Sequence, residues 1–386
     1  MKRKRFKVLS IFGTRPEAIK LAPVIRRLQA DPRRFDTVVA VTAQHREMLD
    51  QVLRLMGIRP QIDLDLMRAE QSLPTLTAAA LAGCGRALAA TKPDLVLVQG
   101  DTSSTLAGAL AAFYQGVAVG HVEAGLRTYR MDNPFPEEAN RRMVSLLATW
   151  HFAATPWAAK NLASEGVPSS RVFVTGNPVV DALHSVQGRE RWAARELVVV
   201  TAHRRENFGR PLAEICRAVL ELARLHPRQE FVFPVHRNPN VRRTVRAVLR
   251  RPPANLKLVP PQPYADFIRL LAQARLVLTD SGGIQEEAPV FGVPALVVRR
   301  VTERPEALQA GARLLPLDRE AIVKAAAAEL RRPLASRRRT TACPFGDGRA
   351  AERIVAAIEW IGGWRKQPPP PFRPPRMKNI SVGHGI

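Results

Sequence analysis

The sequence predicts an α/β protein with two doubly wound parallel sheets, one in each half of the chain. Short apolar runs alternate with segments of helical periodicity, and this pattern occurs twice. Such alternation is typical of parallel strands joined by helical crossovers. With 386 residues, of which 46% are hydrophobic, the chain is long enough to bury two ordinary cores.

The first half contains the strands and helices expected for one sheet. Its strands are expected in FKVLSIF (6–12), DTVVAVTA (36–43), LVLV (95–98), VAVG (117–120), HFAATP (151–156) and RVFVTGNP (171–178). The helix that starts in GTRPEAIK (13–20) has Pro16 in its first turn, and the helix QHREMLDQVLRLMG (44–57) ends at a glycine. The polar segment HSVQGRERWAARE (184–196) suits a boundary, so a first domain of residues 1–177 is expected.

The second half repeats the pattern, so a second domain of residues 178–348 is expected. Its strands begin the segments ELVVVTAHRREN (196–207), EFVFPVHRNPN (230–240), NLKLVPPQPY (255–264), RLVLTDSGGIQEEAPVFG (275–292) and PALVVRRVTERPEAL (294–308). A last helix is expected at residues 349–361. Residues 366–386 are rich in proline and basic side chains and lack apolar periodicity, so this tail is predicted to be disordered.

The charge and the motifs that are missing narrow the classes of ligand. A net charge of +25 suits anions such as nucleic acid, an acidic membrane surface or a phosphorylated metabolite. Aromatic residues make up only 6% of the chain and are not interleaved with basic runs, so nucleic acid is disfavoured. The sequence has no HExxH motif and no GxGxxG after a strand, which argues against a catalytic metal and against a bound dinucleotide cofactor.

Cysteine use and hydropathy predict a soluble cytoplasmic protein. The three cysteines are far apart and lack CxxC spacing, as expected of reduced thiols. The apolar run after MKRKR is too short for a signal peptide, and about 18 continuous apolar residues occur nowhere, so no membrane insertion is expected.

Acidic side chains are concentrated between residues 94 and 142 of this very basic chain. Asp101 follows LVLV, Glu123 follows VAV, and Glu137 and Glu138 lie at a helix start. The carboxyl ends of neighbouring parallel strands face one crevice, where Asp101 and Glu123 would converge on a bound molecule. The alternative is structural, with Asp101 capping the next helix, the two glutamates complementing a helix dipole, and Glu137 pairing with Arg141. The cluster as a whole favours an active site.

Two segments are suited to binding phosphate. Arg15 and Lys20 lie near a helix N-terminus, where backbone N–H groups and cations hold anions, although a solvated basic helix start would look the same. In DSGGIQEEAP (280–289) a Ser-Gly-Gly turn opens into a helix, which lets backbone amides approach an anion closely. Glu287 is suited to accept hydrogen bonds from sugar hydroxyls, the alternative being an exposed acid paired with arginine, and Arg304 is a further candidate cation.

A series of motifs runs in one order through both halves of the chain. They are GTRPEAIK (13–20), TAQHREMLDQVL (42–53), GDTSST (100–105), GHVEAGLRT (120–128), PEEANR (136–141), HRRENFGR (203–210), PVHRNPNV (234–241), DSGGIQEEAP (280–289) and TERPEA (302–307). Together they resemble the bacterial UDP-N-acetylglucosamine 2-epimerases of the non-hydrolysing type. The resemblance extends from about Lys7 to Ile361.

The resemblance implies two Rossmann-like domains of the glycosyltransferase-B type that face a central cleft, with a C-terminal helix (349–365) packed back on the first domain. It implies a homodimer that interconverts UDP-N-acetylglucosamine and UDP-N-acetylmannosamine for cell-surface polysaccharide synthesis, without a nicotinamide cofactor. The residues that match the family's nucleotide-sugar pocket are Arg15, Lys20, Asp101, Glu123, His203, Gln262, Phe267, Ser281, Gly282, Gly283, Glu287 and Arg304.

The resemblance also implies a regulatory site. Gln44, Gln71 and His236 match a second nucleotide-sugar site found in some members of the family. The sequence departs from the family pattern at Gln99 before Gly100, at Ala202 before His203, at Arg300 where aspartate is frequent, and at Ala69-Glu70 before Gln71. None of these departures removes a candidate carboxylate.

The chemistry of the substrate suggests how such an enzyme works without a cofactor. Carbon 2 bears an acetamido nitrogen, so its proton is not acidic until UDP departs from carbon 1. Elimination to a glycal, and return of UDP after protonation of the opposite face, would invert that centre. Two faces require two proton-transfer groups. Asp101, Glu123 and Glu137 are therefore assigned as the acid/base set.

His203, Arg15 and Arg304 are assigned to stabilise the departing diphosphate. Two other activities remain open at this point. A hydrolysing epimerase would release free N-acetylmannosamine and UDP after the same elimination, and a glycosyltransferase on the same fold would need an acceptor sugar.

Overall fold

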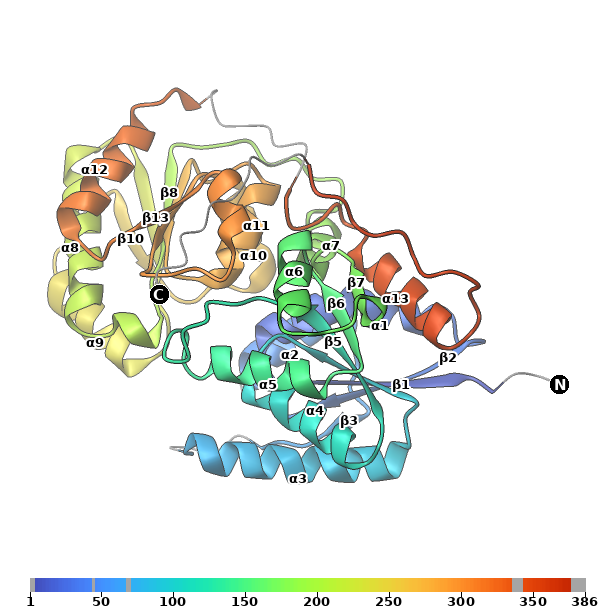
Figure 1. The fold of residues 1–386 in the computed structure, drawn as a ribbon. Helices are drawn as coiled ribbons and strands as arrows, with labels where there is room; N and C mark the ends of the chain where they lie inside the picture. Colours follow the sequence, from blue (N-terminus) through green and yellow to red (C-terminus); the bar gives the residue numbers. More distant parts are fainter. Residues whose placement is uncertain (1–3, 44–45, 67–70, 335–342, 376–386) are drawn as a thin grey trace. The chain divides into compact units, whose positions relative to one another are not determined.

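The computed structural model describes residues 4–43, 46–66, 71–334 and 343–375. The chain forms two compact α/β units (Figure 1). The first unit is built from Met1–Ala182 and Phe345–Pro374, and the second mainly from Leu183–Pro344. The helix α7 (Pro178–Gln187) contains the point at which the chain passes from one unit to the other.

The first unit has a seven-stranded parallel sheet in the order β3-β2-β1-β4-β5-β6-β7. Its strands are β1 (Phe6–Phe12), β2 (Phe35–Val41), β3 (Ile62–Asp63), β4 (Leu95–Gln99), β5 (Ala118–Ala124), β6 (Trp150–Ala153) and β7 (Val172–Val174). Its helices are α1 (Arg15–Gln29), α2 (Arg46–Met56), α3 (Leu73–Thr91), α4 (Ser103–Tyr114), α5 (Glu137–Leu147), α6 (Pro156–Ser164), a 3-10 turn η1 (Ser169–Arg171) and α13 (Ala350–Ile361). Every side chain of β4 is buried, as in a strand covered by helices on both faces.

The second unit has a six-stranded parallel sheet in the order β10-β9-β8-β11-β12-β13. Its strands are β8 (Leu197–Thr201), β9 (Glu230–Pro234), β10 (Leu256–Val259), β11 (Leu276–Thr279), β12 (Ala295–Val298) and β13 (Ala312–Leu315). Its helices are α8 (Arg210–Leu225), α9 (Pro239–Val248), α10 (Tyr264–Gln273), α11 (Gly282–Val290), α12 (Arg319–Leu330) and the 3-10 turns η2 (Arg205–Asn207) and η3 (Pro305–Gln309). Apolar side chains of α8, α9 and α12 form one core with the strands, while α10 and α11 lie on the other face (Figure 1).

Each sheet contains one point where the strand order reverses. In the first unit β1 has β2 on one side and β4 on the other, and in the second unit β8 lies between β9 and β11. Ligands of open parallel sheets bind outside the carboxyl ends of the strands at such a point. The two predicted doubly wound sheets are thus confirmed, and the candidate residues can be sought at the ends of β1, β4, β8 and β11.

The helix α3 is apolar enough to raise the question of a membrane. Among the described residues it is the one helix that is long and apolar enough to span a bilayer by length and composition. It packs along α4 in the helical layer of the first sheet. Only 33% of its apolar window is buried in this packing.

The C-terminal helix α13 belongs to the first unit and packs against α1. The carboxylate of Asp181 accepts the N–H groups of Ala350 and Ala351 at 3.1 and 3.0 Å, in the first turn of α13. Burial raises the pKa of Asp181 to about 6 from its usual 3.8, and these hydrogen bonds oppose that shift in part. An acidic group of α7 thus holds the start of a helix that follows it by 169 residues in sequence.

This contact predicts a pH dependence of stability. Because the folded-state pKa of Asp181 is raised, its contribution to stability is largest below about pH 3.8 and is lost as the pH rises through about 6. Asp181→Asn removes this titration. Between about pH 5 and pH 7.5, the unfolding free energy of the variant should therefore gain about 1 kcal/mol relative to wild type. Urea unfolding of both proteins at the two pH values measures this difference, and a difference that does not change with pH would contradict the assignment.

The first part of the tail is ordered against β7. The N–H of Phe372 donates to the carbonyl of Val174 at 2.7 Å, the ring of Phe372 is buried, and the guanidinium of Arg353 lies over that ring at 5.5 Å. The prediction of disorder is therefore wrong for residues 366–375, because one aromatic side chain and a free edge strand suffice to anchor a proline-rich segment. Residues 376–386 lie outside the described part of the chain.

The anchor predicts a loss of stability in Phe372→Ala. Removing a buried ring exposes its pocket, but the freed segment regains conformational entropy, so a net loss of about 1–3 kcal/mol is expected. Arg373→Ala, a change at the next and exposed residue, should leave the midpoint of thermal unfolding nearly unchanged. Equal melting of Phe372→Ala and wild type would show that the tail contributes nothing.

Candidate functional site

The end of β5 presents Glu123 in a buried polar cluster. The backbone of Glu123 has a positive φ of 65°, which makes a sharp turn in the chain near the end of the strand. Gly125, directly after β5, also has a positive φ, of 90°. The ammonium of Lys20, from α1, forms an ion pair with the carboxylate of Glu123, and Asn177 Nδ2 donates to the same oxygen at 2.9 Å. All three side chains are buried. Glu123 is thus held in one orientation by a cation and an amide.

Asp101 lies beyond the end of β4, next to Glu123 along the sheet. The N–H of Gly100 donates to the carbonyl of Val122 at 3.0 Å, which fixes the turn that carries Asp101. Arg141 Nε donates to the carboxylate of Asp101 at 3.0 Å, and Arg141 also pairs with Glu138 at 2.9 Å. The structural alternative, in which Asp101 caps the next helix, is wrong because Thr102 is the N-cap of α4 and accepts the N–H of Thr105.

Glu138 has a structural role that the sequence alone did not distinguish from that of Glu137. Its carboxylate is fully buried and accepts the N–H groups of Thr128 and Tyr129, both at 3.0 Å. Glu137 begins α5 and is partly exposed. Of the two glutamates, therefore, Glu138 orders the loop after β5, while Glu137 is the first residue of α5.

The start of α1 is fixed by Glu17 rather than by its cations. The buried carboxylate of Glu17 accepts the N–H groups of Gly13 and Thr14 at 3.1 and 2.7 Å and the hydroxyls of Thr102 and Thr105 at 2.8 and 3.0 Å. Burial raises its pKa above 4.5. A Cβ on Gly13 would lie 2.0 Å from the hydroxyl of Thr42, so only glycine fits here. This network places Arg15 at the first residue of α1, beside the end of β4.

In the second unit, Asp280 follows β11 and its side chain binds the loop after β8. Its buried carboxylate accepts the N–H groups of His203 and Arg204 at 2.9 Å and the side-chain amide of Asn207 at 3.0 Å. His203 Nδ1 lies 3.5 Å from the same carboxylate. The ring of His203 stacks on that of His236, with centroids 5.3 Å apart and planes at 16°. His203 is thereby oriented from two sides.

The Ser-Gly-Gly turn opens into a helix as predicted. Ser281 is the N-cap of α11, which begins at Gly282, and the N–H of Ser281 donates to the hydroxyl of Thr279 at 2.9 Å. A Cβ on Gly282 would approach the guanidinium of Arg304 to 2.8 Å. Glycine here therefore lets a cation reach the start of the helix, which is an arrangement suited to an anion.

Arg304 is more strongly engaged by protein groups than the sequence suggested. It is buried, its Nε donates to Glu286 at 2.7 Å, and its Nη1 pairs with Glu303. Glu287, on the same helix as Glu286, is also buried, and Tyr264 Oη donates to it at 3.4 Å. The alternative of an exposed helix acid is therefore wrong for Glu287.

The remaining candidates are placed as follows. Gln262 precedes α10 and donates to the carbonyl of Pro260 at 2.6 Å, and Phe267 lies on the second turn of α10, partly buried. Gln44 lies outside the described residues. In the described ranges, no three His, Cys, Asp or Glu side chains come together in a way that would hold a metal ion.

Several residues of the polar clusters in the two units had no clear sequence pattern that would have predicted their roles. They are Asn177, Glu17, Arg141, Asn207 and Asp280. Glu17 resembles any acid in a first helical turn, and Asn177 lies more than 50 residues from its partner, so only the fold brings them into the site. Glu17, Arg141, Asn207 and Asp280 nevertheless lie inside the matched motifs, whereas Asn177 lies in none of them.

Two Rossmann-like units with parallel sheets, each with a polar cluster at the carboxyl ends of its strands, make this a protein of the glycosyltransferase-B fold class. A family model described as UDP-N-acetylglucosamine 2-epimerase matches residues 26–359. The UDP-N-acetylglucosamine 2-epimerase of Escherichia coli K12 is 48% identical over 375 residues, which are 92% of this chain and 98% of that protein. This chain belongs to the UDP-N-acetylglucosamine 2-epimerase family.

Solved structures agree with this assignment. The crystal structure of UDP-GlcNAc 2-epimerase from Neisseria meningitidis bound to UDP-GlcNAc is similar with a TM-score of 0.86 and 43% identity, covering 92% of this chain and 99% of that one. The S. aureus MnaA–UDP co-structure is similar with a TM-score of 0.90 and 41% identity, covering 95% and 100%. The resemblance of the motifs to the UDP-N-acetylglucosamine 2-epimerases is confirmed.

Proposed function

We propose that this protein interconverts UDP-N-acetylglucosamine and UDP-N-acetylmannosamine by the non-hydrolysing route, through elimination and re-addition of UDP. The observation that carries the proposal is the buried Glu123 at the end of β5, which Lys20 and Asn177 hold in one orientation next to the strand β4 that leads to Asp101. The Neisseria meningitidis relative has been crystallised with UDP-GlcNAc, which supports the same substrate class here.

In the first step the bond between carbon 1 and the diphosphate oxygen breaks, and UDP departs with the electron pair. Positive charge develops on the sugar ring, and this acidifies the proton on carbon 2. One carboxylate removes that proton, and the electron pair forms the double bond of the glycal. Preorganised cations and N–H groups would stabilise the leaving diphosphate. His203, Arg15, Arg304 and the N-terminus of α11 are the groups proposed for this role.

In the second step a proton is delivered to the opposite face of carbon 2, and UDP returns to carbon 1. The proton balance requires one group that accepts and another that donates, because a single carboxylate cannot reach both faces. Asp101, Glu123 and Glu137 are the proposed set. The fixed hydrogen bonds of Asp101 and Glu123 keep them at two defined positions along one sheet edge. No redox step occurs, so no nicotinamide is required.

The other pocket residues are proposed to bind the nucleotide sugar. Backbone N–H groups at Ser281, Gly282 and Gly283 suit the diphosphate. Glu287 suits the ribose hydroxyls, because a carboxylate accepts hydrogen bonds on both of its oxygens. Gln262 and Phe267, at the start of α10, are proposed to contact the base.

The nearest alternative is a hydrolysing epimerase, and product analysis separates the two. Incubation with UDP-N-acetylglucosamine alone should give an equilibrium mixture of the two UDP-sugars with little free UDP. Ion-exchange chromatography resolves the nucleotide sugars from UDP and from free N-acetylmannosamine. Stoichiometric release of free sugar and UDP would show hydrolysis, and turnover only with an added acceptor sugar would show a glycosyltransferase.

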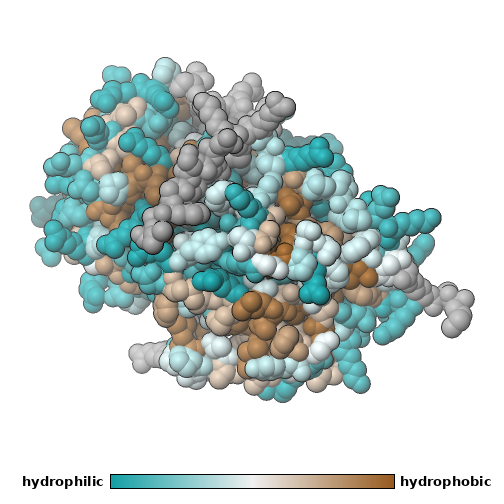
Figure 2. Space-filling view, in the orientation of Figure 1, coloured by the Kyte–Doolittle hydropathy of each residue, from teal (hydrophilic) through white to brown (hydrophobic). Residues whose placement is uncertain are grey.

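We further propose that the enzyme works as a cytoplasmic homodimer that supplies sugars for cell-surface polysaccharides. Support for self-association comes from apolar side chains at the ends of α4 and α5, notably Phe113, Tyr114 and Leu146, of which Leu146 is 85% exposed. Figure 2 shows a hydrophobic patch over this part of the first unit. A patch of this kind marks an interaction surface. Sedimentation equilibrium at twice the chain mass would support it, and a monomer at micromolar concentration would not.

A further inference from the structure

A dense basic segment lies on α9 and its flanks, between His236 and Gln262. Between Glu230 and Asp266 the chain contains no acidic residue. The basic residues of this segment are Arg237, Arg242, Arg243, Arg246, Arg250, Arg251 and Lys257. Within the described parts of the chain, no carboxylate lies within ion-pair distance of Arg242 or Arg246. Their charges are therefore available to a ligand.

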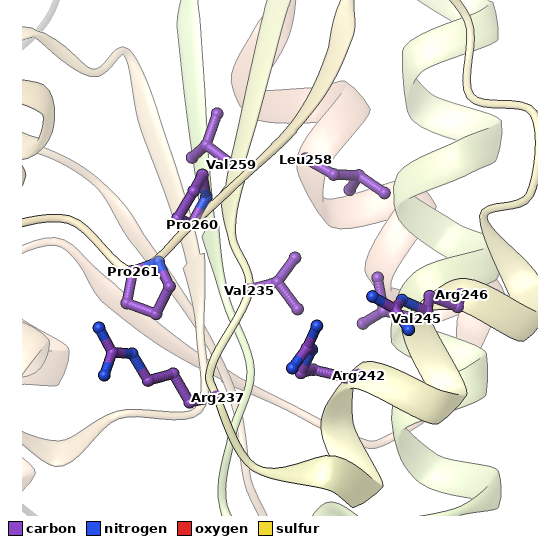
Figure 3. Close-up of a pocket in the computed structure, with 9 residues that line it drawn as sticks. All are labelled: Val235, Arg237, Arg242, Val245, Arg246, Leu258, Val259, Pro260 and Pro261. Carbon is purple, nitrogen blue, oxygen red and sulfur yellow. The ribbon is translucent and has the colours of Figure 1, made fainter.

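A cavity of about 350 Å³ opens among these arginines. Arg242 and Arg246 line it from α9, and the apolar side comes from Val235 and from residues 258–261 at the end of β10. In Figure 3, Pro260 and Pro261 lie on one side of Arg242, and Val245 and Arg246 lie on the other. The cavity thus combines guanidinium groups with valine and proline surfaces.

We propose that this cavity binds a small organic phosphate. Two guanidiniums one turn apart on a helix match a phosphate dianion, which each of them can bind through two N–H groups. A bare phosphate would leave the apolar side unused, so the preferred ligand carries a flat or apolar group against Val235 and Pro261. An extended polyanion such as RNA is an alternative ligand, but the small cavity and its apolar lining favour a compact one.

The cavity is connected to His203 through the loop between β9 and α9. Val235 and Arg237 line the cavity, and the residue between them, His236, stacks on His203 at 5.3 Å. A ligand that fixes Val235 and Arg237 also fixes the position of His236. We infer that occupancy of the cavity alters the affinity for UDP at the His203 half-site, a step that rests on the proposed function. His236, which matches the family's regulatory site, lies in this loop but does not line the cavity.

The binding test uses phenyl phosphate, inorganic phosphate and neutral benzyl alcohol, titrated calorimetrically into the full-length protein saturated with UDP. Phenyl phosphate should bind once per chain and about tenfold more tightly than inorganic phosphate, and benzyl alcohol should not bind measurably. The double variant Arg242→Gln/Arg246→Gln should lose about tenfold or more in affinity for phenyl phosphate. Arg243→Gln, on the same helix but outside the cavity, should bind as wild type does.

Three outcomes would overturn the site. Equal weakening by Arg243→Gln would show a diffuse basic surface instead of a built cavity. Competition between phenyl phosphate and UDP would place the ligand in the catalytic half-sites. Displacement of phenyl phosphate by a short single-stranded RNA, with the RNA bound more tightly and lost in the same double variant, would show a polyanion surface.

The coupling is tested by measuring UDP affinity with and without saturating phenyl phosphate. A change of about threefold or more is expected in wild type. At the same phenyl phosphate concentration the change should be smaller in Arg242→Gln/Arg246→Gln, because this variant binds phenyl phosphate less tightly. Phenyl phosphate binding without any effect on UDP would leave the site in place and overturn the coupling. If UDP itself failed to bind, the proposed function would fail, while binding of phenyl phosphate without UDP would still test the cavity.

Discussion

Glu123→Gln, Asp101→Asn and Glu137→Gln are each expected to lower kcat by about 100-fold or more, since a positioned acid or base is worth about 100- to 10,000-fold. Each amide keeps the size of the carboxylate but can neither accept nor deliver the proton on carbon 2. UDP affinity should change little, because the groups proposed to hold the diphosphate are untouched. Initial rates at saturating UDP-N-acetylglucosamine, with calorimetry for UDP, measure both quantities.

The structure calls for a control on folding in two of these variants. Asp101→Asn weakens the ion pair of the buried Arg141, and Glu123→Gln leaves the buried Lys20 beside a neutral amide, so both proteins should be less stable. Activity must therefore be measured well below each midpoint of thermal unfolding. Asp132→Asn, an exposed acid in the loop before α5, should retain full activity. Wild-type kcat in all three carboxylate variants would rule out the proposed acid/base set.

Most of the fold was predictable because buried parallel strands are short, continuous apolar runs. β1, β4 and β11 are of this kind, and their positions follow from the sequence within one or two residues. The strands β3 and β13 were missed for a physical reason. β3 has two residues at a sheet edge, and β13 mixes buried and exposed side chains, so neither shows the pattern of a buried strand.

The candidate site was predictable where a residue ends a strand or starts a helix. Asp101, His203 and Ser281 lie at the switch points of the two sheets, and Glu123 lies at the end of the neighbouring strand β5, so that sequence position alone gives spatial position. The side chains that hold them could not be predicted. Asn177 reaches Glu123 from the end of another strand, and such partners are fixed by tertiary packing.

The tail shows the limit of reasoning from composition. A proline-rich basic segment cannot form its own core, yet its disorder depends on whether the folded protein offers a surface. Here β7 ends the sheet with an unpaired edge, and the single hydrogen bond to Val174 with burial of Phe372 is enough to order the preceding prolines. The presence of Phe372 in the tail indicated an anchor, which the overall composition of the segment did not show.

Product formed in heavy water is expected to carry deuterium at carbon 2, in essentially every turnover. In the proposed route, one carboxylate removes the proton from one face, and a different group delivers a proton to the other. The delivering group exchanges with solvent before the glycal is protonated, so the new hydrogen is solvent-derived. Proton NMR of the isolated UDP-N-acetylmannosamine should lack the carbon 2 signal, and its mass should rise by one unit.

The same experiment tests the assignment of two faces. If one group both removed and returned the proton, shielded from solvent, part of the product would keep its original hydrogen. Transient oxidation elsewhere on the ring would leave carbon 2 unlabelled altogether, and that result would overturn the elimination mechanism. With Glu123→Gln, residual exchange of deuterium into the substrate without formation of the epimer would show that the step on one face survives when the other is lost. That outcome would assign Glu123 to the face of carbon 2 on which proton transfer is lost in the variant.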